Sequence, residues 1–182
     1  MLEPNFSPFP ELTTIRLLLR RLRMEDAPEI FFLRSDQAIL KFLSKEPAAN
    51  RKEAEDFITR INHDIDANNA IMWALVLKEN PAYVIGCISF WRMLKEHHRA
   101  ELGYVLNPAY WRKGIMKETI FKILEYGFTV MGLHSVEARI NPGNIASVSV
   151  LESTGFVREA YYKEDFFHHG KFEDTAVYSR LQ

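Results

Sequence analysis

The chain has 182 residues, of which 47% are hydrophobic and 26% are charged, and its formal net charge is −1. This balance is typical of a globular domain and excludes the disordered, fibrous and membrane-spanning classes. A chain of this length buries roughly two-thirds of its unfolded surface on folding, so it needs no metal or disulfide for stability. Lys and Arg are spread along the sequence, so no basic patch predicts a nucleic-acid partner.

The cysteine content and the first residues predict where the protein works. Cys87 lies in an apolar run, where a thiol has neither exposure nor a neighbouring base, so we expect it to be buried and inert. A single cysteine forms no intrachain disulfide, which favours a reducing compartment. Residues 1–10 lack the features of a signal peptide, and nowhere do about eighteen apolar residues run together. We therefore expect a cytoplasmic protein without a membrane partner.

The chain is expected to begin with a lead-in over residues 1–13, followed by a single domain over residues 14–182. Three prolines among the first ten residues predict that the lead-in is loose. An alternating pattern from Thr14 to Leu22 then predicts a strand. Asp26 followed by Pro28 predicts the cap and first turn of a helix.

The middle of the chain is predicted to contain two amphipathic helices separated by strands. Apolar residues recur on one face from Arg51 to Asn68, which predicts the first of these helices. Three strand-like runs follow, and we expect them to form an antiparallel meander over Ile71–Lys78, Val84–Trp91 and Arg99–Leu106. The clearest amphipathic pattern in the chain predicts a helix from about Arg112 to Val130.

The last part of the sequence predicts a strand, a helix and two closing strands, over Ser135–Ile140, Asn144–Thr154, Phe156–Phe166 and Phe172–Arg180. Gly155 follows the helix in the position of a C′ glycine. Strands and helices interleaved in this way indicate an α+β fold around one central sheet.

A candidate anion site lies where the predicted strand ending at Leu106 turns into the following helix. The N–H groups of a first helical turn and the positive end of the helix dipole point at any ligand there, and Gly114 lets the ligand approach the backbone. Arg112, Lys113 and Lys117 add positive charge, so a pyrophosphate suits this place. An ordinary strand-to-helix connection with solvated lysines explains the same residues equally well. The chain has neither a Walker nor a dinucleotide-binding pattern.

Two motifs resemble those of a known enzyme family. Asn107-Pro-Ala-Tyr-Trp-Arg-Lys-Gly-Ile-Met resembles the acetyl-CoA pyrophosphate loop of GNAT-superfamily N-acetyltransferases, in particular the bacterial ribosomal-protein N-terminal (Rim-type) branch. Asn144-Ile-Ala-Ser-Val-Ser-Val-Leu-Glu-Ser-Thr-Gly-Phe resembles the downstream motif of that branch. The resemblance runs from about Thr14 to Leu181, and it implies a single GNAT-like domain whose mixed central sheet of about seven strands is flanked by helices.

The resemblance implies acetyl-CoA as co-substrate and no metal. It assigns the pyrophosphate to the backbone N–H groups of Arg112, Lys113, Gly114, Ile115, Met116 and Lys117. It assigns the pantetheine arm to Asn144 and to the strand edge, where the backbone of Tyr104 and Leu106 pairs with the amides of the arm. Asn144 equally fits a role as the cap of its own helix, and the two roles are compatible.

The resemblance also implies three catalytic groups. The Tyr104 N–H is expected to hold the thioester oxygen, Glu101 to take a proton from the amine, and Ser147 to donate a hydrogen bond to the leaving thiolate. Glu101 equally fits a structural pairing with Arg99 or with an arginine of a neighbouring strand. Ser147 equally fits an early-helix residue that satisfies backbone groups.

Three positions depart from the family pattern. Met116 stands where many members have Gly or Ala, and we expect its side chain to point into the core. Leu151 replaces the tyrosine that often acts as general acid, which leaves the acid unidentified. Phe166 stands where the Rim-type branch tends to carry a carboxylate, with Glu164 and Asp165 nearby, so the identity of the base is open as well.

Four histidines occur as two adjacent pairs, His97–His98 and His168–His169. Neither pair has the spacing of a zinc site. We expect all four to be solvated residues of turns.

The function implied by the resemblance is direct transfer of an acetyl group from acetyl-CoA to a primary amine, with both substrates bound together and no covalent enzyme intermediate. The expected acceptor is a peptide or protein N-terminus, or else a small amine such as a polyamine, amino acid or antibiotic. The alternative is a catalytically inactive acyl-CoA-binding regulatory module of the same fold, and a third is a structural protein that binds no cofactor. The sequence leaves open whether the protein is a monomer or a homodimer.

Overall fold

The computed structural model describes residues 1–43, 45–168 and 170–182. Its strands are β1 (Leu12–Thr13), β2 (Leu17–Arg20), β3 (Ile71–Leu77), β4 (Asn80–Leu94), β5 (Arg99–Leu106), β6 (Ser135–Ile140), β7 (Val157–His168) and β8 (Lys171–Leu181). Its helices are α1 (Ala27–Ser35), α2 (Gln37–Leu40), α3 (Arg51–Asp66), α4 (Ile115–Thr129) and α5 (Ile145–Ser153). Its 3-10 turns are η1 (Met24–Asp26), η2 (Lys95–His97) and η3 (Pro108–Tyr110).

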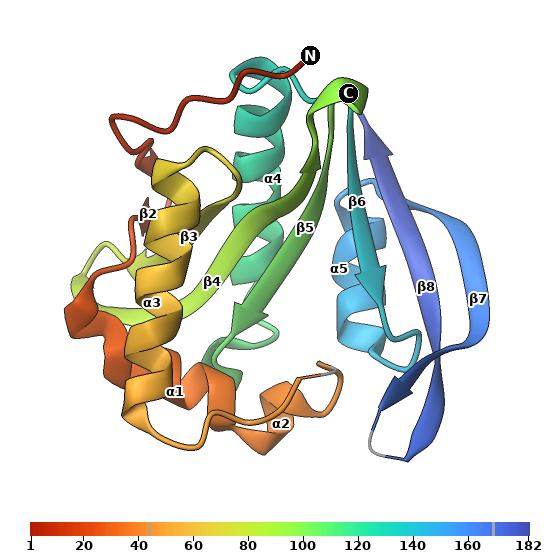
Figure 1. Ribbon diagram of the computed structural model, residues 1–182, viewed down its shortest axis with the longest axis horizontal. Helices are drawn as coiled ribbons and strands as arrows, with labels where there is room; N and C mark the ends of the chain where they lie inside the picture. The colour runs from red at the N-terminus through yellow and green to blue at the C-terminus, as the bar shows by residue number, and fades with distance from the viewer. Residues whose placement is uncertain (44, 169) are drawn as a thin grey trace.

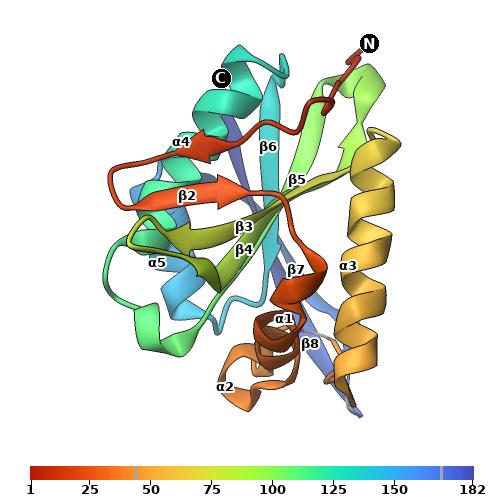
Figure 2. The ribbon, with the colours of Figure 1, turned by 90° about the vertical axis from the view of Figure 1, so that its left-hand side faces the viewer.

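The strands form one mixed sheet in the order β1-β2-β3-β4-β5-β6-β8-β7. Helices α1 and α3 lie on one face of this sheet, and α4 and α5 lie on the other (Figures 1 and 2). The predicted α+β fold with one central sheet is confirmed. Within the described part of the chain, the sheet has eight strands where about seven were expected, and the additional one is the two-residue β1. Among the helices of the described residues, none is long and apolar enough to cross a membrane.

Around the predicted anion site, the strands and the helix occur where the sequence predicts them, except that the helix begins at a different residue. The antiparallel meander β3-β4-β5 is confirmed, and β5 has the predicted bounds. The prediction that the next helix begins near Arg112 is wrong, because α4 begins at Ile115. Arg112 and Gly114 have φ angles of 60° and 72°, which lie outside the helical region, so an amphipathic pattern alone set the start too early.

The strands β5 and β6 separate along their length, and this divergence opens the sheet. They pair in parallel, with Arg99 opposite Ser135 at the start and Glu101 opposite Glu137 at the end. Beyond Glu101, β5 continues to Leu106, but within the described residues no further pair joins it to β6. The two ribbons diverge toward their arrowheads in Figure 1. One edge of β5 is therefore left without a strand partner.

Each face of the sheet has its own apolar core. The core under α4 includes Trp73, whose ring makes edge contacts with Phe90 and Tyr126 at centroid distances of 6.2 and 5.6 Å. The core under α1 and α3 includes Ile58 and the predicted buried thiol of Cys87. Burial raises the pKa of Cys87 to about 12, so the thiol is inert as predicted.

A buried ion pair fixes the start of α1. The Arg20 guanidinium donates to both Asp26 oxygens at 2.7 and 2.8 Å, and both side chains are 2% exposed. Asp26 also accepts the Arg23 N–H at 2.7 Å. Asp26 is the N-cap residue of α1, as predicted, but these donors occupy its carboxylate, which makes no capping bond to α1. Pro28 stands in the first turn as predicted.

The N-terminal segment packs against the domain more firmly than its prolines suggest. Leu2 and Phe6 are 4% and 3% exposed and belong to the core under α4. The Leu2 N–H donates to the Lys95 carbonyl at 2.8 Å, and the Phe6 N–H donates to Asn68 Oδ1 at 2.8 Å. The expectation of a loose start is therefore wrong for this segment, because two apolar side chains gain burial by folding back.

Candidate functional site

The connection between β5 and α4 turns sharply before the helix begins. Asn107 caps η3 by accepting the Ala109 N–H at 2.9 Å. The backbone then takes positive φ angles at Arg112 and Gly114. A Cβ added at Gly114 would make only an ordinary contact, with the Arg16 guanidinium at 3.6 Å. Gly114 is thus required by the left-handed backbone rather than by close packing.

This turn presents a run of unpaired backbone N–H groups, which we call the amide run (residues 112–117). Within the part of the chain that the structure describes, these groups donate to no protein acceptor. The first helical bond of α4 runs from the Glu118 N–H to the Gly114 carbonyl at 3.1 Å. The positive end of the helix dipole lies at the same place. Such a concave array of donors fits a pyrophosphate.

Contacts from the N-terminal part of the chain hold this turn in place. The Arg16 guanidinium donates to the Lys113 carbonyl at 2.8 Å and pairs with Glu118 at 2.7 Å. Glu118 also accepts the Thr14 hydroxyl and the Arg16 N–H. Burial opposes ionisation of Glu118, but these hydrogen bonds outweigh it and lower the pKa of the carboxyl. Thr14 and Arg16 lie 104 and 102 residues away from Glu118 in the sequence, so no local motif signals their role.

Two departures from the family pattern are core residues in the structure. Met116 is 8% exposed and belongs to the core under α4, as predicted. Its side chain therefore points away from the ligand side of the amide run, where only its N–H is needed. Leu151 of α5 is fully buried in the same core, so this position stabilises the fold.

The edge of β5 that faces away from β4 is open next to this turn. The Asn107 N–H donates to the Ile85 carbonyl of β4 at 2.8 Å. Because the backbone groups of successive residues in a strand point to alternate edges, Tyr104 and Leu106 direct theirs away from β4. This is the edge that β6 leaves unpaired beyond Glu101 in the described residues. An extended ligand can pair with it as an added strand.

Trp111 already satisfies one acceptor on that edge. Its indole N–H donates to the Leu106 carbonyl at 2.7 Å, and its ring is 42% exposed. An extended ligand can still pair with the Leu106 N–H and with both backbone groups of Tyr104.

Asn144 and Ser147 lie at the N-terminus of α5, across the gap from β5. The Asn144 side chain accepts the Ser147 N–H at 3.1 Å, so its role as a helix cap is confirmed. The Ser147 hydroxyl accepts a hydrogen bond from the Tyr104 hydroxyl at 3.1 Å. Burial raises the pKa of Tyr104 to about 12, while the hydrogen bond to Ser147 acts in the opposite sense. The structure therefore brings two of the predicted site residues into direct contact.

Glu101 occupies the last position at which β5 pairs with β6, and this residue is nearly buried, with 8% exposure. Arg92 of β4 is its partner, with Nη1 3.3 Å from Glu101 Oε2, whereas Arg99 pairs with Glu137 instead. Burial raises the pKa of Glu101, Arg92 lowers it and Glu137 raises it, and the net result is a raised pKa. A carboxyl of this kind is a suitable proton acceptor at neutral pH.

Charged side chains surround a small cavity beside Glu101. Its volume is about 150 Å³, and Glu137 and three arginines line it. Arg139 lies 3.8 Å from Glu137 and 3.6 Å from Asp165 of β7. Asp165 thus brings a carboxylate toward this cavity through Arg139, whereas Phe166, the residue that the family pattern aligns there, is 40% exposed.

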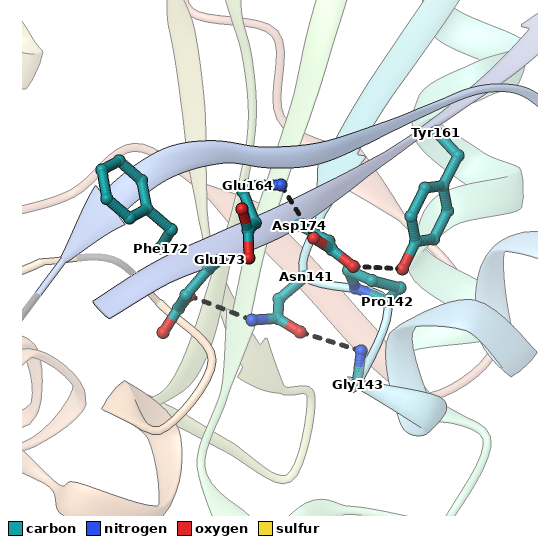
Figure 3. Close-up of a pocket in the computed structure, with 8 residues that line it drawn as sticks. All are labelled: Asn141, Pro142, Gly143, Tyr161, Glu164, Phe172, Glu173 and Asp174. Carbon is teal, nitrogen blue, oxygen red and sulfur yellow. Dashed lines mark hydrogen bonds between the residues drawn. The ribbon is translucent and has the colours of Figure 1, made fainter.

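A larger cavity of about 520 Å³ lies between the loop joining β6 to α5 and the β7-β8 hairpin (Figure 3). We call it the acidic cavity, because Glu164, Glu173 and Asp174 line it. The Tyr161 hydroxyl donates to Asp174 at 2.5 Å, and the Asn141 amide donates to Glu173 at 3.0 Å. Hydrogen bonds from Tyr161 and from the Glu164 N–H lower the pKa of Asp174. The cavity is built from separate segments, so no sequence motif signals it.

The structure confirms the predicted turn positions for two of the four paired histidines. His97 and His98 lie in and directly after η2, so their placement in a turn is confirmed. His168 is the last residue of β7, so the turn prediction is wrong for it, and His169 lies outside the described residues. Among the side chains that the structure describes, no group of three or more His, Cys, Asp or Glu residues could hold a metal ion.

The amino-acid sequence is similar to known proteins over most of its length. The sequence model of the acetyltransferase (GNAT) domain matches residues 16–157. The chain is 32% identical over 171 residues to the uncharacterized N-acetyltransferase p20 of Bacillus licheniformis, and the match covers 94% of this chain and 96% of that protein.

Solved structures are similar as well. The spermidine N-acetyltransferase from Vibrio cholerae, in complex with CoA and spermine, has a TM-score of 0.80 at 26% identity, covering 91% of this chain and 95% of that one. The ribosomal-protein-S5-alanine acetyltransferase from Vibrio fischeri shares the fold, with a TM-score of 0.84 at 24% identity and coverage of 94% and 96%. Because the domain match spans most of the chain and the p20 relative matches nearly all of it, the chain belongs to the GNAT acetyltransferase family and is an acetyl-CoA-dependent N-acetyltransferase.

Proposed function

We propose that the protein transfers the acetyl group of acetyl-CoA directly to a primary amine, with both substrates bound at the same time. The observation that carries this proposal is the amide run, which leads into the open edge of β5. A site for a diphosphate beside an unpaired strand edge suits one elongated, anionic co-substrate. Holding both substrates together lets the amine attack the thioester without an enzyme nucleophile.

The proposed placement of acetyl-CoA follows from these features. The amide run holds the pyrophosphate, with the exposed side chains of Arg112, Lys113 and Lys117 around it. The pantetheine arm lies along β5 and pairs with the backbone of Tyr104 and with the Leu106 N–H. Asn144 contacts the same arm while it caps α5. The thioester then lies in the gap between β5 and α5.

The proposed proton acceptor is Glu101. It takes a proton from the acceptor ammonium, directly or through a water molecule, so that the nitrogen has a lone pair. That lone pair forms a bond to the thioester carbon, and the carbonyl π electrons move to the oxygen. The nitrogen then loses a second proton, the carbonyl re-forms, and the C–S bond breaks with its electron pair on sulfur. One released proton returns to the sulfur, which leaves an N-substituted acetamide, a free thiol and one proton.

Two further groups stabilise charge during this transfer. The Tyr104 N–H donates to the thioester oxygen, where negative charge develops as the amine adds. The Ser147 hydroxyl donates a hydrogen bond to the sulfur, where charge develops as the thiol leaves. The Tyr104 N–H points to the open edge of β5, and the Ser147 hydroxyl contacts the side chain of the same residue.

Two kinds of acceptor fit the proposal. A peptide or protein N-terminus is the first, on the resemblance to the Rim-type branch. A small polycationic amine is the second, and the acidic cavity favours it, since the three carboxylates that line it attract ammonium groups. The similar spermidine N-acetyltransferase from Vibrio cholerae is a polyamine enzyme, which supports this candidate.

Release of free thiol from acetyl-CoA, measured with an N-terminal peptide library and a small-amine library, tests the proposal. We expect release that depends on the amine. Binding of acetyl-CoA without such release would support the inactive acyl-CoA-binding module instead. Calorimetry that shows no acetyl-CoA binding would overturn both.

Substitutions in the acidic cavity can distinguish the two classes of acceptor. For a polycationic acceptor, the double variant Glu173→Gln/Asp174→Asn should raise KM several-fold, because it removes two charges that attract the acceptor. The KM for a monoamine, which carries a single positive charge, should change much less. Glu125→Gln on the exposed face of α4 is the matched control and should leave both values unchanged. Equal KM values for a polyamine with and without the two carboxylates would exclude the cavity as its binding site.

A further inference from the structure

A hydrogen bond between two side chains bridges the gap between β5 and α5. The Tyr104 hydroxyl donates to Ser147 Oγ at 3.1 Å. Tyr104 lies on β5 beyond Glu101, the last residue at which this strand pairs with β6. Ser147 stands in the first turn of α5, which follows β6 in the chain. The bridge therefore crosses the region where the two strands have separated.

The contacts of Ser147 determine which way its hydroxyl can donate. Asn144 accepts the Ser147 N–H at 3.1 Å, so the Ser147 backbone is fixed by the cap of its helix. A serine oxygen that accepts a hydrogen bond from a phenol keeps its own proton for another acceptor. Hydrogen bonds in such a chain polarise one another, so the serine becomes a stronger donor.

We propose that the side chain of Tyr104 is a positioning residue for acetyl transfer, whose hydroxyl orients Ser147 so that the serine O–H points at the departing sulfur. This inference rests on the proposed function and extends it, because it gives the phenol a role separate from that of the Tyr104 backbone N–H. The phenol and the serine end the reaction with the protons they had at the start. The proton on the product thiol is one of the two released by the amine.

The protonation state of Tyr104 agrees with this role. Burial raises its pKa to about 12, so the phenol keeps its proton throughout the physiological range and acts as a hydrogen-bond donor. A free thiol has a pKa of about 8.5, so full proton transfer from this phenol to a thiolate is unfavourable. Orientation of Ser147 is therefore the contribution that its chemistry allows.

The variant Tyr104→Phe tests the inference, because it removes one oxygen and keeps the ring and the backbone N–H. We expect kcat to fall about tenfold, while KM for acetyl-CoA and for the amine changes less than about twofold. Ser147→Ala should lower kcat at least as much. The double variant Tyr104→Phe/Ser147→Ala should match Ser147→Ala alone, because without the serine the phenol has nothing to orient.

Tyr178→Phe is the matched control. It removes a phenol that donates to Glu152 on the same helix at 3.4 Å, so it tests whether the anchoring of α5 alone changes the rate. We expect this variant to keep the wild-type kcat. An equal loss in Tyr178→Phe and Tyr104→Phe would overturn the inference, as would a wild-type kcat in Tyr104→Phe or effects of the two site substitutions that multiply.

The two proposals fail in different ways. If the wild-type protein binds acetyl-CoA but releases no thiol with any amine, the proposed function is wrong. If the wild-type protein is active and Tyr104→Phe is equally active at the same melting temperature, the proposed function stands and the role of the phenol is wrong.

Discussion

Glu101 of β5 and Glu137 of β6 lie directly opposite each other at the last position where these two strands pair. Arg92 contacts Glu101, and Arg99 and Arg139 contact Glu137. The Glu137 charge and the burial of Glu101 together raise the Glu101 pKa. The carboxylate proposed as the base thus stands where the sheet begins to open, among charges that can tune it.

Glu101→Gln should lower kcat by about 10²-fold or more, because a general base typically contributes 10² to 10⁴. It should not lower the melting temperature at neutral pH. The pKa of Glu101 is raised in the folded protein, so the ionised form disfavours folding, and the associated stability is lost as pH rises through the folded pKa. An amide escapes that loss, and Arg92, which is 62% exposed, stays solvated.

Activity and thermal unfolding of Glu101→Gln should be measured beside Glu159→Gln, which changes an exposed carboxylate of β7. We expect the control to resemble the wild type in both measurements. A Glu101→Gln variant with wild-type kcat would show that another group takes the proton.

The pH dependence of kcat/KM should respond in opposite directions to the removal of two of the charged neighbours of Glu101, Arg92 and Glu137. Arg92 lowers the Glu101 pKa and Glu137 raises it. Removing the cation with Arg92→Ala should therefore move the acidic limb of the profile to higher pH. Removing the like charge with Glu137→Gln should move it to lower pH. Profiles measured with one acceptor check this, and a shift in the same direction for both variants would contradict the assignment of Glu101.

Gly114→Ala should raise KM for acetyl-CoA about tenfold or more, because a left-handed alanine costs roughly 1–3 kcal/mol and relaxation of the turn disperses the amide run. Gly132→Ala is the control, since Gly132 has nearly the same φ, 73° against 72°, and follows the other end of α4. Both substitutions should lower the melting temperature. Only Gly114→Ala should change the KM for acetyl-CoA. An equal increase in KM in both variants would indicate that destabilisation of α4 as a whole, rather than of the amide run, weakens binding.

Arg20→Met should lower the free energy of unfolding by about 3–5 kcal/mol, because it leaves the Asp26 carboxylate buried without its partner. The two side chains are each 2% exposed and joined by two hydrogen bonds. The double variant Arg20→Met/Asp26→Leu should recover most of the loss, since no unpaired charge is then buried. Urea unfolding measures both values, and an equally unstable double variant would show that the pair contributes more than charge balance.

Much of the site was predictable because it is local in sequence. The meander, the amphipathic α4 and the bounds of β5 follow from side-chain periodicity, which depends on neighbouring residues. The turn at Gly114 and the cap at Asn144 are also local, since the relevant backbone groups lie within a few residues. The start of α4 could not be predicted in this way, because the periodicity of side chains carries no information about the positive φ angles of Arg112 and Gly114.

The amino-acid order by itself determined most of the helices and strands and the tight turn before α4, because these depend on contacts between residues close in the chain. Only the tertiary structure decided that Arg16 supports this turn, that Tyr104 contacts Ser147 and that three carboxylates share one cavity. The first two of these contacts join residues that are far apart in the chain, 102 positions for Arg16 and Glu118 and 43 for Tyr104 and Ser147. Their partners are chosen by how the sheet and helices pack, and no local pattern records that choice.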